Sequence, residues 1–152
     1  MARYLLDTNI VCFAFDASSP HGGRVLSRLA RLDDADEACV SILTLYELRY
    51  SLANLPPGDL ATGARIRQAI ASIRSSFALL PLSPAGADLF GRMKAAYQSH
   101  FGVHRGAMRQ VTIDIMIAAQ AVEHGAVLVS HDAYFPKLSR AFPACRVQDW
   151  AD

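Results

Sequence analysis

The chain has 152 residues, with 15 lysines and arginines against 14 aspartates and glutamates, and a formal net charge of +1 at pH 7. This balance excludes a protein that coats nucleic acid through a broad basic surface and leaves only local contacts with RNA or DNA. Although 52% of the residues are hydrophobic, no apolar stretch approaches the roughly 20 residues that cross a bilayer. We therefore expect no membrane association. The apolar N-terminal stretch is interrupted by Asp7 and Asn9, which favours a first core strand over a signal peptide.

The length fits a single domain over residues 1–152 that needs neither a disulfide nor a structural metal. A mean hydropathy of +0.18 indicates a core closed on both sides or an apolar surface covered by a partner. Cys12, Cys39 and Cys145 are far apart and match no zinc spacing. Each has apolar neighbours in the sequence, so we expect small buried side chains. Unpaired thiols indicate a reducing compartment, and we predict the cytoplasm.

The first part of the chain alternates strands with helices. Residues 3–7 (RYLLD) predict a short apolar strand that ends on an acid, and residues 8–15 predict a helix. Residues 21–32 carry apolar side chains at helical spacing. Residues 38–42 (ACVSI) predict the second strand.

The middle of the chain continues this alternation. A helix is predicted over residues 43–55, ended by a pair of prolines, and another over residues 59–77. Residues 78–82 (ALLPL) predict the third strand. A further helix begins with Ser83 as cap and proline as its first residue, and runs to about Ser99.

The last part begins with residues 100–111, whose two glycines, two histidines and two arginines predict a mobile loop. Residues 112–123 predict a helix, ended by Gly125. Residues 127–130 and 145–148 predict the fourth and fifth strands. Strands that alternate with helices, and that are apolar without a period of two, indicate a parallel sheet buried on both faces. We therefore predict a three-layer α/β/α fold with five parallel strands.

Acidic residues fall where such a sheet binds its ligands, beyond the carboxyl ends of the strands. Asp7 directly follows the first strand, and Asp132 follows the fourth by one residue. Asp114 is expected in the first turn of a helix capped by Thr112. Glu47 is expected in the first turn of a helix that begins near Thr44.

Each acid also has a purely structural explanation. Glu47 can complete a capping box with Thr44, Asp114 can favour the positive end of its helix, and Asp7 and Asp132 can be turn residues. Four carboxylates at one edge, however, repel one another unless cations neutralise them. Oxygen ligands of this kind suit Mg²⁺ or Mn²⁺.

The segments LLDTNIV, SILTLYELRYSL, TIDIMIAAQAVEHGAVLVSHD and VQDW resemble PIN-domain ribonucleases of the VapC toxin type. The most specific piece is Asp114 followed by isoleucine and two alanines, with Gly125 and a Leu-Val pair after it. The resemblance implies a PIN-like fold and a metal-dependent endoribonuclease, the toxin of a toxin–antitoxin pair. It also implies an antitoxin partner and a homodimer. By residue, it implies metal-binding carboxylates and supporting residues as follows: Asp7, Glu47, Asp114 and Asp132 as ligands, with Thr8 and Asn9 around the first acid.

Some residues depart from the family pattern. The family often has an aromatic-flanked histidine or an Arg-Asn pair after the fourth strand, whereas here Ser130, His131 and Asp132 stand in that order. The segment of residues 100–109 is longer and more basic than is usual. Its Arg105 and Arg109 are close in sequence to Asp114 and are the better candidates for contacts with RNA phosphates.

Other features of the sequence allow further interpretations. His100 and His104 have the spacing of zinc ligands but no third ligand. Tyr46 and Tyr50, one helical turn apart, can stack on bases, although packing against a neighbouring helix is the expected role, and Trp150 is expected to cover the core. A non-catalytic PIN-type RNA-binding or scaffold domain is the strongest alternative. Such a domain is expected to have lost acids, and all four are present.

Overall fold

The computed structural model describes residues 1–152 and contains one five-stranded sheet in which every neighbouring pair of strands is parallel. The strand order is β3-β2-β1-β4-β5, which confirms the predicted α/β fold with five parallel strands. The strands are β1 (Arg3–Leu6), β2 (Glu37–Ser41), β3 (Ala78–Leu80), β4 (Val127–Val129) and β5 (Val147–Gln148).

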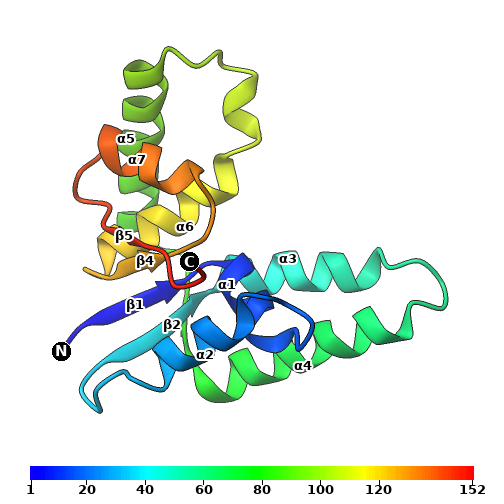
Figure 1. Cartoon of the computed structure of the whole chain (residues 1–152). Coiled ribbons are helices and arrows are strands. Elements are labelled where there is room, and N and C mark those ends of the chain that lie inside the picture. Colours follow the sequence, from blue (N-terminus) through cyan, green and yellow to red (C-terminus); the bar gives the residue numbers. More distant parts are fainter.

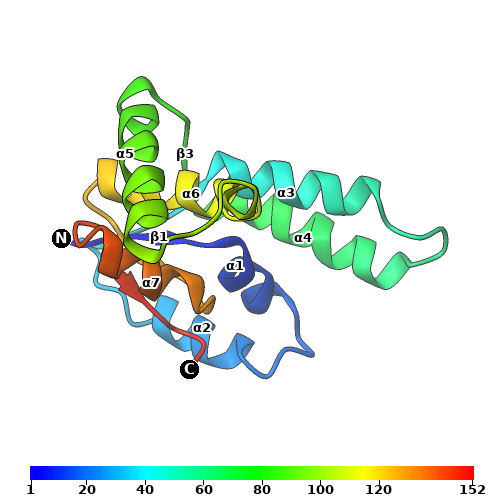
Figure 2. The ribbon, with the colours of Figure 1, turned by 90° about the horizontal axis from the view of Figure 1, so that it is seen from above.

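Seven helices cover the sheet (Figure 1). The helices are α1 (Thr8–Phe15), α2 (Gly22–Leu29), α3 (Ile42–Ala53), α4 (Leu60–Ser76), α5 (Pro84–Phe101), α6 (Thr112–Glu123) and α7 (Tyr134–Ala141). Helices α1 to α4 lie on one side of the sheet and α5 to α7 on the other, and the α3–α4 hairpin projects away from the rest (Figures 1 and 2).

The central strand shows why both faces are covered. Successive side chains of a strand point to opposite faces, and in β1 both Leu5 and Leu6 are buried. Leu5 packs in the cluster that includes Ile115 of α6, and Leu6 packs in the cluster that includes Ile73 of α4. A strand without polar alternation therefore has an apolar layer on each side, as the sequence predicts.

Two features differ from the predicted elements. No helix was predicted between residues 131 and 144, whereas α7 forms there and buries Phe135 and Leu138. A proline in its first turn hid this short helix, although prolines are tolerated at that position. The segment predicted as a loop over residues 100–111 is also shorter, because α5 runs through Phe101 and ends at Gly102 with φ of 60°. Met108 is buried and anchors this segment to the core.

Several single-residue expectations are resolved. Cys39 and Cys145 are buried, and burial raises the pKa of these thiols to about 12 and about 11. Cys12 is exposed, so its predicted burial was wrong. Trp150 is buried, as expected. None of the helices is both long and apolar enough to span a membrane.

Candidate active site

All four predicted acids are at or near the carboxyl edge of the sheet. Asp7 follows β1, and Asp132 follows β4, the strand that pairs with β1. Asp114 is in the first turn of α6, and Glu47 is in the second turn of α3. The negative charges of the other three raise the pKa of Asp114, so the four carboxylates share one electrostatic environment.

Asp7 is the most buried of the four, with 6% of its surface exposed. One carboxylate oxygen accepts a hydrogen bond from the Thr8 backbone N–H at 2.8 Å and so caps α1. The other accepts from the Ser130 hydroxyl at 2.8 Å. Burial raises the pKa of Asp7 to about 6, although both hydrogen bonds lower it, and the charges of Glu47 and Asp132 add to the rise. This carboxylate thus ionises close to neutral pH.

Asp114 has a pKa of about 7, raised first by burial and then by the charges of Asp7, Asp132 and Glu47. None of the four acids forms an ion pair with a lysine, arginine or histidine. Four carboxylates without a basic partner give a strongly negative edge, and their charges add to the effect of burial in disfavouring the ionised states of Asp7 and Asp114.

Glu47 is held from the opposite side of the same edge. Its Oε1 accepts a hydrogen bond from the Thr8 hydroxyl at 2.7 Å, and that hydroxyl is 3.0 Å from the Thr44 hydroxyl. Helix α3 begins at Ile42 and is capped by Ser41, so the predicted start near Thr44 was wrong. Because Thr44 is buried inside the helix and not at its cap, Glu47 does not belong to a capping box.

Asp132 is both an edge acid and a turn residue. Its Oδ1 accepts from the Tyr134 backbone N–H at 2.9 Å, which stabilises the start of α7.

The helix that carries Asp114, α6, also begins differently from the prediction. Val111 is its N-cap, and Thr112 is its first residue, which donates its hydroxyl to the Met108 carbonyl at 3.0 Å.

Ser130 is the residue that the sequence analysis missed. Its hydroxyl donates to Asp7 and accepts from the Asp132 backbone N–H at 3.1 Å and from the Asn9 amide at 3.3 Å. One sequence pattern could have indicated Ser130. Asp7 and Ser130 each follow directly after one of two parallel strands, and the neighbouring pair, Leu6 and Val129, is in register.

The basic and aromatic candidates are outside this hydrogen-bonded centre. Arg105 and Arg109 are exposed in the segment between α5 and α6, and neither forms an ion pair. Tyr46 and Tyr50 are each 70% exposed, so their expected packing against a neighbouring helix was wrong. His104 accepts a backbone hydrogen bond within its own turn.

His131 is tied to the C-terminal segment. Its Nδ1 is 2.8 Å from the Asp149 carboxylate, and its ring is 4.7 Å from the ring of His21. His21 itself bonds the Ala151 carbonyl at 2.9 Å. A second histidine thus accompanies His131.

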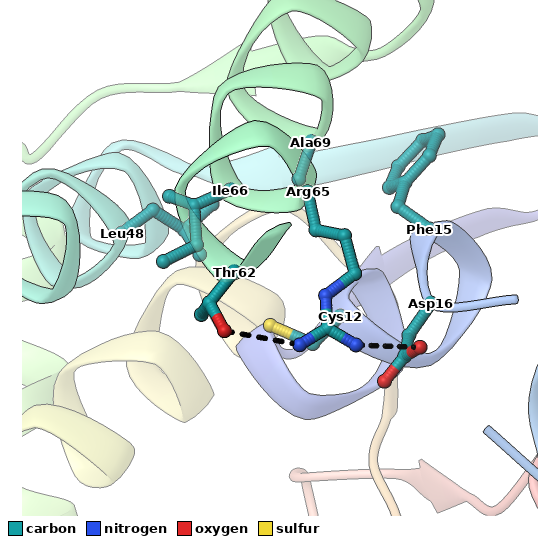
Figure 3. Close-up of a pocket in the computed structure, with 8 residues that line it drawn as sticks. All are labelled: Cys12, Phe15, Asp16, Leu48, Thr62, Arg65, Ile66 and Ala69. Carbon is teal, nitrogen blue, oxygen red and sulfur yellow. Dashed lines mark hydrogen bonds and ion pairs between the residues drawn. The ribbon is translucent and has the colours of Figure 1, made fainter. Parts of the chain in front are cut away.

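A separate apolar cavity of about 180 Å³ lies between α1, α3 and α4 (Figure 3). Arg65 crosses its mouth and donates to Asp16 at 3.1 Å and to Thr62 at 3.2 Å. Cys12 and Leu48 are part of its lining. None of the four acids lines this cavity.

The acids have the donor chemistry that a divalent cation requires, namely carboxylate oxygens with no basic partner. With the side chains as they stand, no three His, Cys, Asp or Glu residues are close enough together to hold a metal ion. Hydrogen bonds hold Asp7, Glu47 and Asp132 in place, and mutual repulsion favours their separation. A cation would relieve that repulsion. For three of the carboxylates to bind the same cation, their side chains would have to rotate toward one another.

The fold is similar to chains of solved toxin–antitoxin complexes. A chain of VapBC2 from Rickettsia felis, bound to a DNA fragment from the promoter, has a TM-score of 0.73 at 20% identity, with 97% of this chain and 98% of that one covered. A chain of VapBC-1 from nontypeable Haemophilus influenzae has a TM-score of 0.72 at 21% identity, with 99% of each covered. A chain of DNA-bound VapBC from Salmonella typhimurium has a TM-score of 0.69 at 24% identity, with 99% of each chain covered.

At these identities the likeness shows the fold alone. A comparison with curated proteins found no match. A family model, in contrast, matches residues 4–141, the stretch that carries Asp7, Glu47, Asp114 and Asp132. The family is the PIN domain, and the chain belongs to it.

Proposed function

We propose that this PIN domain is a metal-dependent endoribonuclease and the toxin of a toxin–antitoxin pair. The observation that carries the proposal is the set of four carboxylates at one edge of the sheet without a basic partner, where burial and the neighbouring acids raise the pKa values of Asp7 and Asp114. Groups with strongly perturbed pKa values are concentrated at functional sites. The ligands in this proposal are Asp7, Glu47, Asp114 and Asp132.

The surrounding residues would hold these ligands in place. Thr8 supports two acids at once, because its backbone N–H bonds Asp7 and its hydroxyl bonds Glu47. Asn9 supports Ser130, which in turn bonds Asp7. A bound Mg²⁺ or Mn²⁺ would lower the pKa of a water molecule and stabilise negative charge on the phosphate. Arg105 and Arg109 would hold the RNA strand through its phosphates.

Attack by water predicts products with a 5′-phosphate and a 3′-hydroxyl, and it leaves the ribose 2′-hydroxyl unused. The alternative is attack by that 2′-hydroxyl, which needs an acid and a base. His21 and His131 form a pair of suitable rings, and this pair is the specific observation in favour of the alternative. We favour attack by water, because the four carboxylates have no basic partner and their oxygens suit a divalent cation.

The test is cleavage of single-stranded RNA by the purified protein with Mg²⁺ or Mn²⁺, followed by analysis of the product ends. Asp114→Asn removes one charge from the edge without loss of a hydrogen bond, and we expect cleavage to fall by at least 100-fold. Asp88→Asn, an exposed residue of α5, is the matched control. Full activity in excess EDTA, or 2′,3′-cyclic phosphate ends, would overturn the metal mechanism. Binding of RNA without cleavage would support the non-catalytic alternative.

The partner proposal rests on the exposed apolar side chains. These include Leu26, Tyr46, Tyr50 and Leu60, of which Tyr46 and Tyr50 are one helical turn apart on α3. The similar solved structures are described as VapBC and toxin–antitoxin complexes. We infer that an antitoxin covers part of this surface and that a second copy of the chain covers another part. The free thiols suit a cytoplasmic location.

A further inference from the structure

A polar hollow of about 360 Å³ lies beside the acid edge, at the carboxyl ends of β4 and β5 and the start of α7. Ser130 and Asp132 form part of its wall. These two residues also belong to the acid edge, where Ser130 bonds Asp7. A group bound in the hollow would therefore lie directly next to a phosphate held at the acids.

One wall of the hollow presents a histidine with a defined proton position. The Nδ1 of His131 is 2.8 Å from the Asp149 carboxylate, which can only accept a hydrogen bond. Nδ1 must therefore carry a proton and donate. In the neutral ring the other nitrogen, Nε2, is then left as an acceptor.

Another wall presents an amide with a defined orientation. The indole N–H of Trp150 can only donate, and it is 3.0 Å from the Gln148 side-chain oxygen. Because Trp150 is buried and fixed, this contact determines which end of the amide is the oxygen. The two N–H donors of exposed Gln148 have no partner in the protein and are available to a ligand.

We propose that this hollow holds the base of the nucleotide next to the scissile phosphate, with Gln148 donating to the base edge and His131 accepting from it. Proteins recognise single-stranded RNA by hydrogen bonds to such exposed base edges. Pro136 and Val147 supply apolar wall beside these polar groups. The proposal rests on the proposed nuclease function and adds to it two residues that determine base preference and one, Asp149, that positions His131.

The first test changes the donors into acceptors. Gln148→Glu keeps an oxygen for the Trp150 N–H but replaces the amide N–H groups with a carboxylate oxygen. Wild type and variant are given a pool of single-stranded RNA with random sequence, and the cut ends are sequenced. We expect the base preference at one nucleotide beside the cut to change by about tenfold. Gln68→Glu, an exposed residue of α4, adds the same charge elsewhere and should leave the preference unchanged.

The second test acts on His131 through its positioning residue. Asp149 accepts from His131 at one carboxylate oxygen and from the Ala151 backbone N–H, at 2.8 Å, at the other. In Asp149→Asn one of these two oxygens becomes an NH₂ group, which cannot accept. The hold on the Nδ1 proton is therefore weakened. We expect a change of preference at the same nucleotide as in Gln148→Glu. A merely structural role would instead lower the rate on every sequence equally.

The outcomes separate this inference from the function on which it rests. If the wild type cuts the pool and both variants cut with the wild-type preference, the subsite is wrong and the nuclease proposal stands. If the wild type cuts no RNA, both proposals fall. A shared change at one nucleotide, absent from Gln68→Glu, supports the subsite.

Discussion

One hydroxyl group organises the negative edge. Ser130 donates to Asp7 and accepts from the Asn9 amide and the Asp132 backbone N–H. Its bond to Asp7 is the largest of the effects that lower the pKa of that acid, although burial outweighs it. The ionised form of Asp7, which a metal ion would need, therefore depends partly on the neutral residue that follows the neighbouring strand β4.

Ser130→Ala should weaken metal binding in a pH-dependent way. Without the hydroxyl the pKa of Asp7 rises above its value of about 6, so less of the carboxylate is ionised at any pH below neutrality. Because the ligand must lose its proton to bind a metal, we expect roughly 3- to 10-fold weaker Mn²⁺ binding at pH 6.5, as one hydrogen bond to a charge allows. The difference should shrink by pH 8.5, and calorimetric titration at both pH values measures it.

Ser139→Ala is the matched control for that experiment, because Ser139 lies on α7 and its hydroxyl does not contact Asp7. Equal weakening at both pH values in Ser130→Ala would point to a distorted site and would contradict the account given for Asp7.

The order of residues in the sequence was enough to predict the acids, but not the hydrogen bonds that hold the residues around them. Parallel strands end at one edge of a sheet, so Asp7 and Asp132 could be brought together from their positions alone. The bonds of Ser130 to Asp7 and of Gln148 to Trp150 depend on strand register and rotamer, which hydrophobic pattern does not specify. The same limit hid the pairing of His21 with His131, whose rings are 110 positions apart in sequence.

At the scale of elements, length alone does not explain which helices were predicted. The eight-residue α1 and α2 were predicted together with the longer α4 and α6, whereas α7, also eight residues long and with a proline in its first turn, was not. The start of α3 was displaced because Ser41 and Thr44 are both plausible caps, and the structure uses Ser41. Composition alone could not choose between them, since both hydroxyls can accept from a helix N–H.

Buried polar contacts connect elements in a way that no single segment shows. Gln120 of α6 is buried and donates to the Leu80 carbonyl at 3.1 Å and to the Pro81 carbonyl at 2.9 Å. It also accepts from the hydroxyl of Ser41, the cap of α3. A glutamine on an apolar helix thus joins the ends of β2 and β3 to α6, and α6 in turn carries Asp114. The position of that acid therefore depends on the sheet edge and not on its own helix alone.

For the whole molecule, the proposed function as a toxin predicts that the protein is toxic in the absence of a partner. Expressed alone, the protein should arrest the growth of its host, and Asp7→Ala should relieve the arrest. Asp88→Ala, on the outer surface of α5, is the control and should leave the arrest intact. Growth curves after induction, with immunoblots to match protein levels, measure the effect. Normal growth with abundant wild-type protein would contradict the toxin assignment.

The metal-free protein should also be more stable in mild acid than in mild base. The pKa values of Asp7 and Asp114 are raised from 3.8 to about 6 and about 7 in the folded state, so the folded protein binds protons more tightly than the unfolded chain. Their contribution to stability is therefore complete below pH 3.8 and is lost as the pH rises through 6 and 7. The pKa of Asp16 is lowered, so its contribution to stability is lost as the pH falls. That loss occurs only at a lower pH than the titrations of Asp7 and Asp114.

Between pH 8 and pH 5 in EDTA we expect the free energy of unfolding to rise by about 2 kcal/mol, after allowance for the partial exposure of Asp114, and the Tm by about 5 °C. Asp114→Asn replaces the ionisable group with a neutral one, so it should melt higher than wild type at pH 8 and show a smaller dependence on pH. Added Mn²⁺ should raise the wild-type Tm at pH 8 and raise that of Asp114→Asn much less. Thermal melts followed by circular dichroism supply all of these values. A wild-type Tm that increases from pH 5 to pH 8 in EDTA would show that repulsion among the four carboxylates does not govern the stability of the empty site.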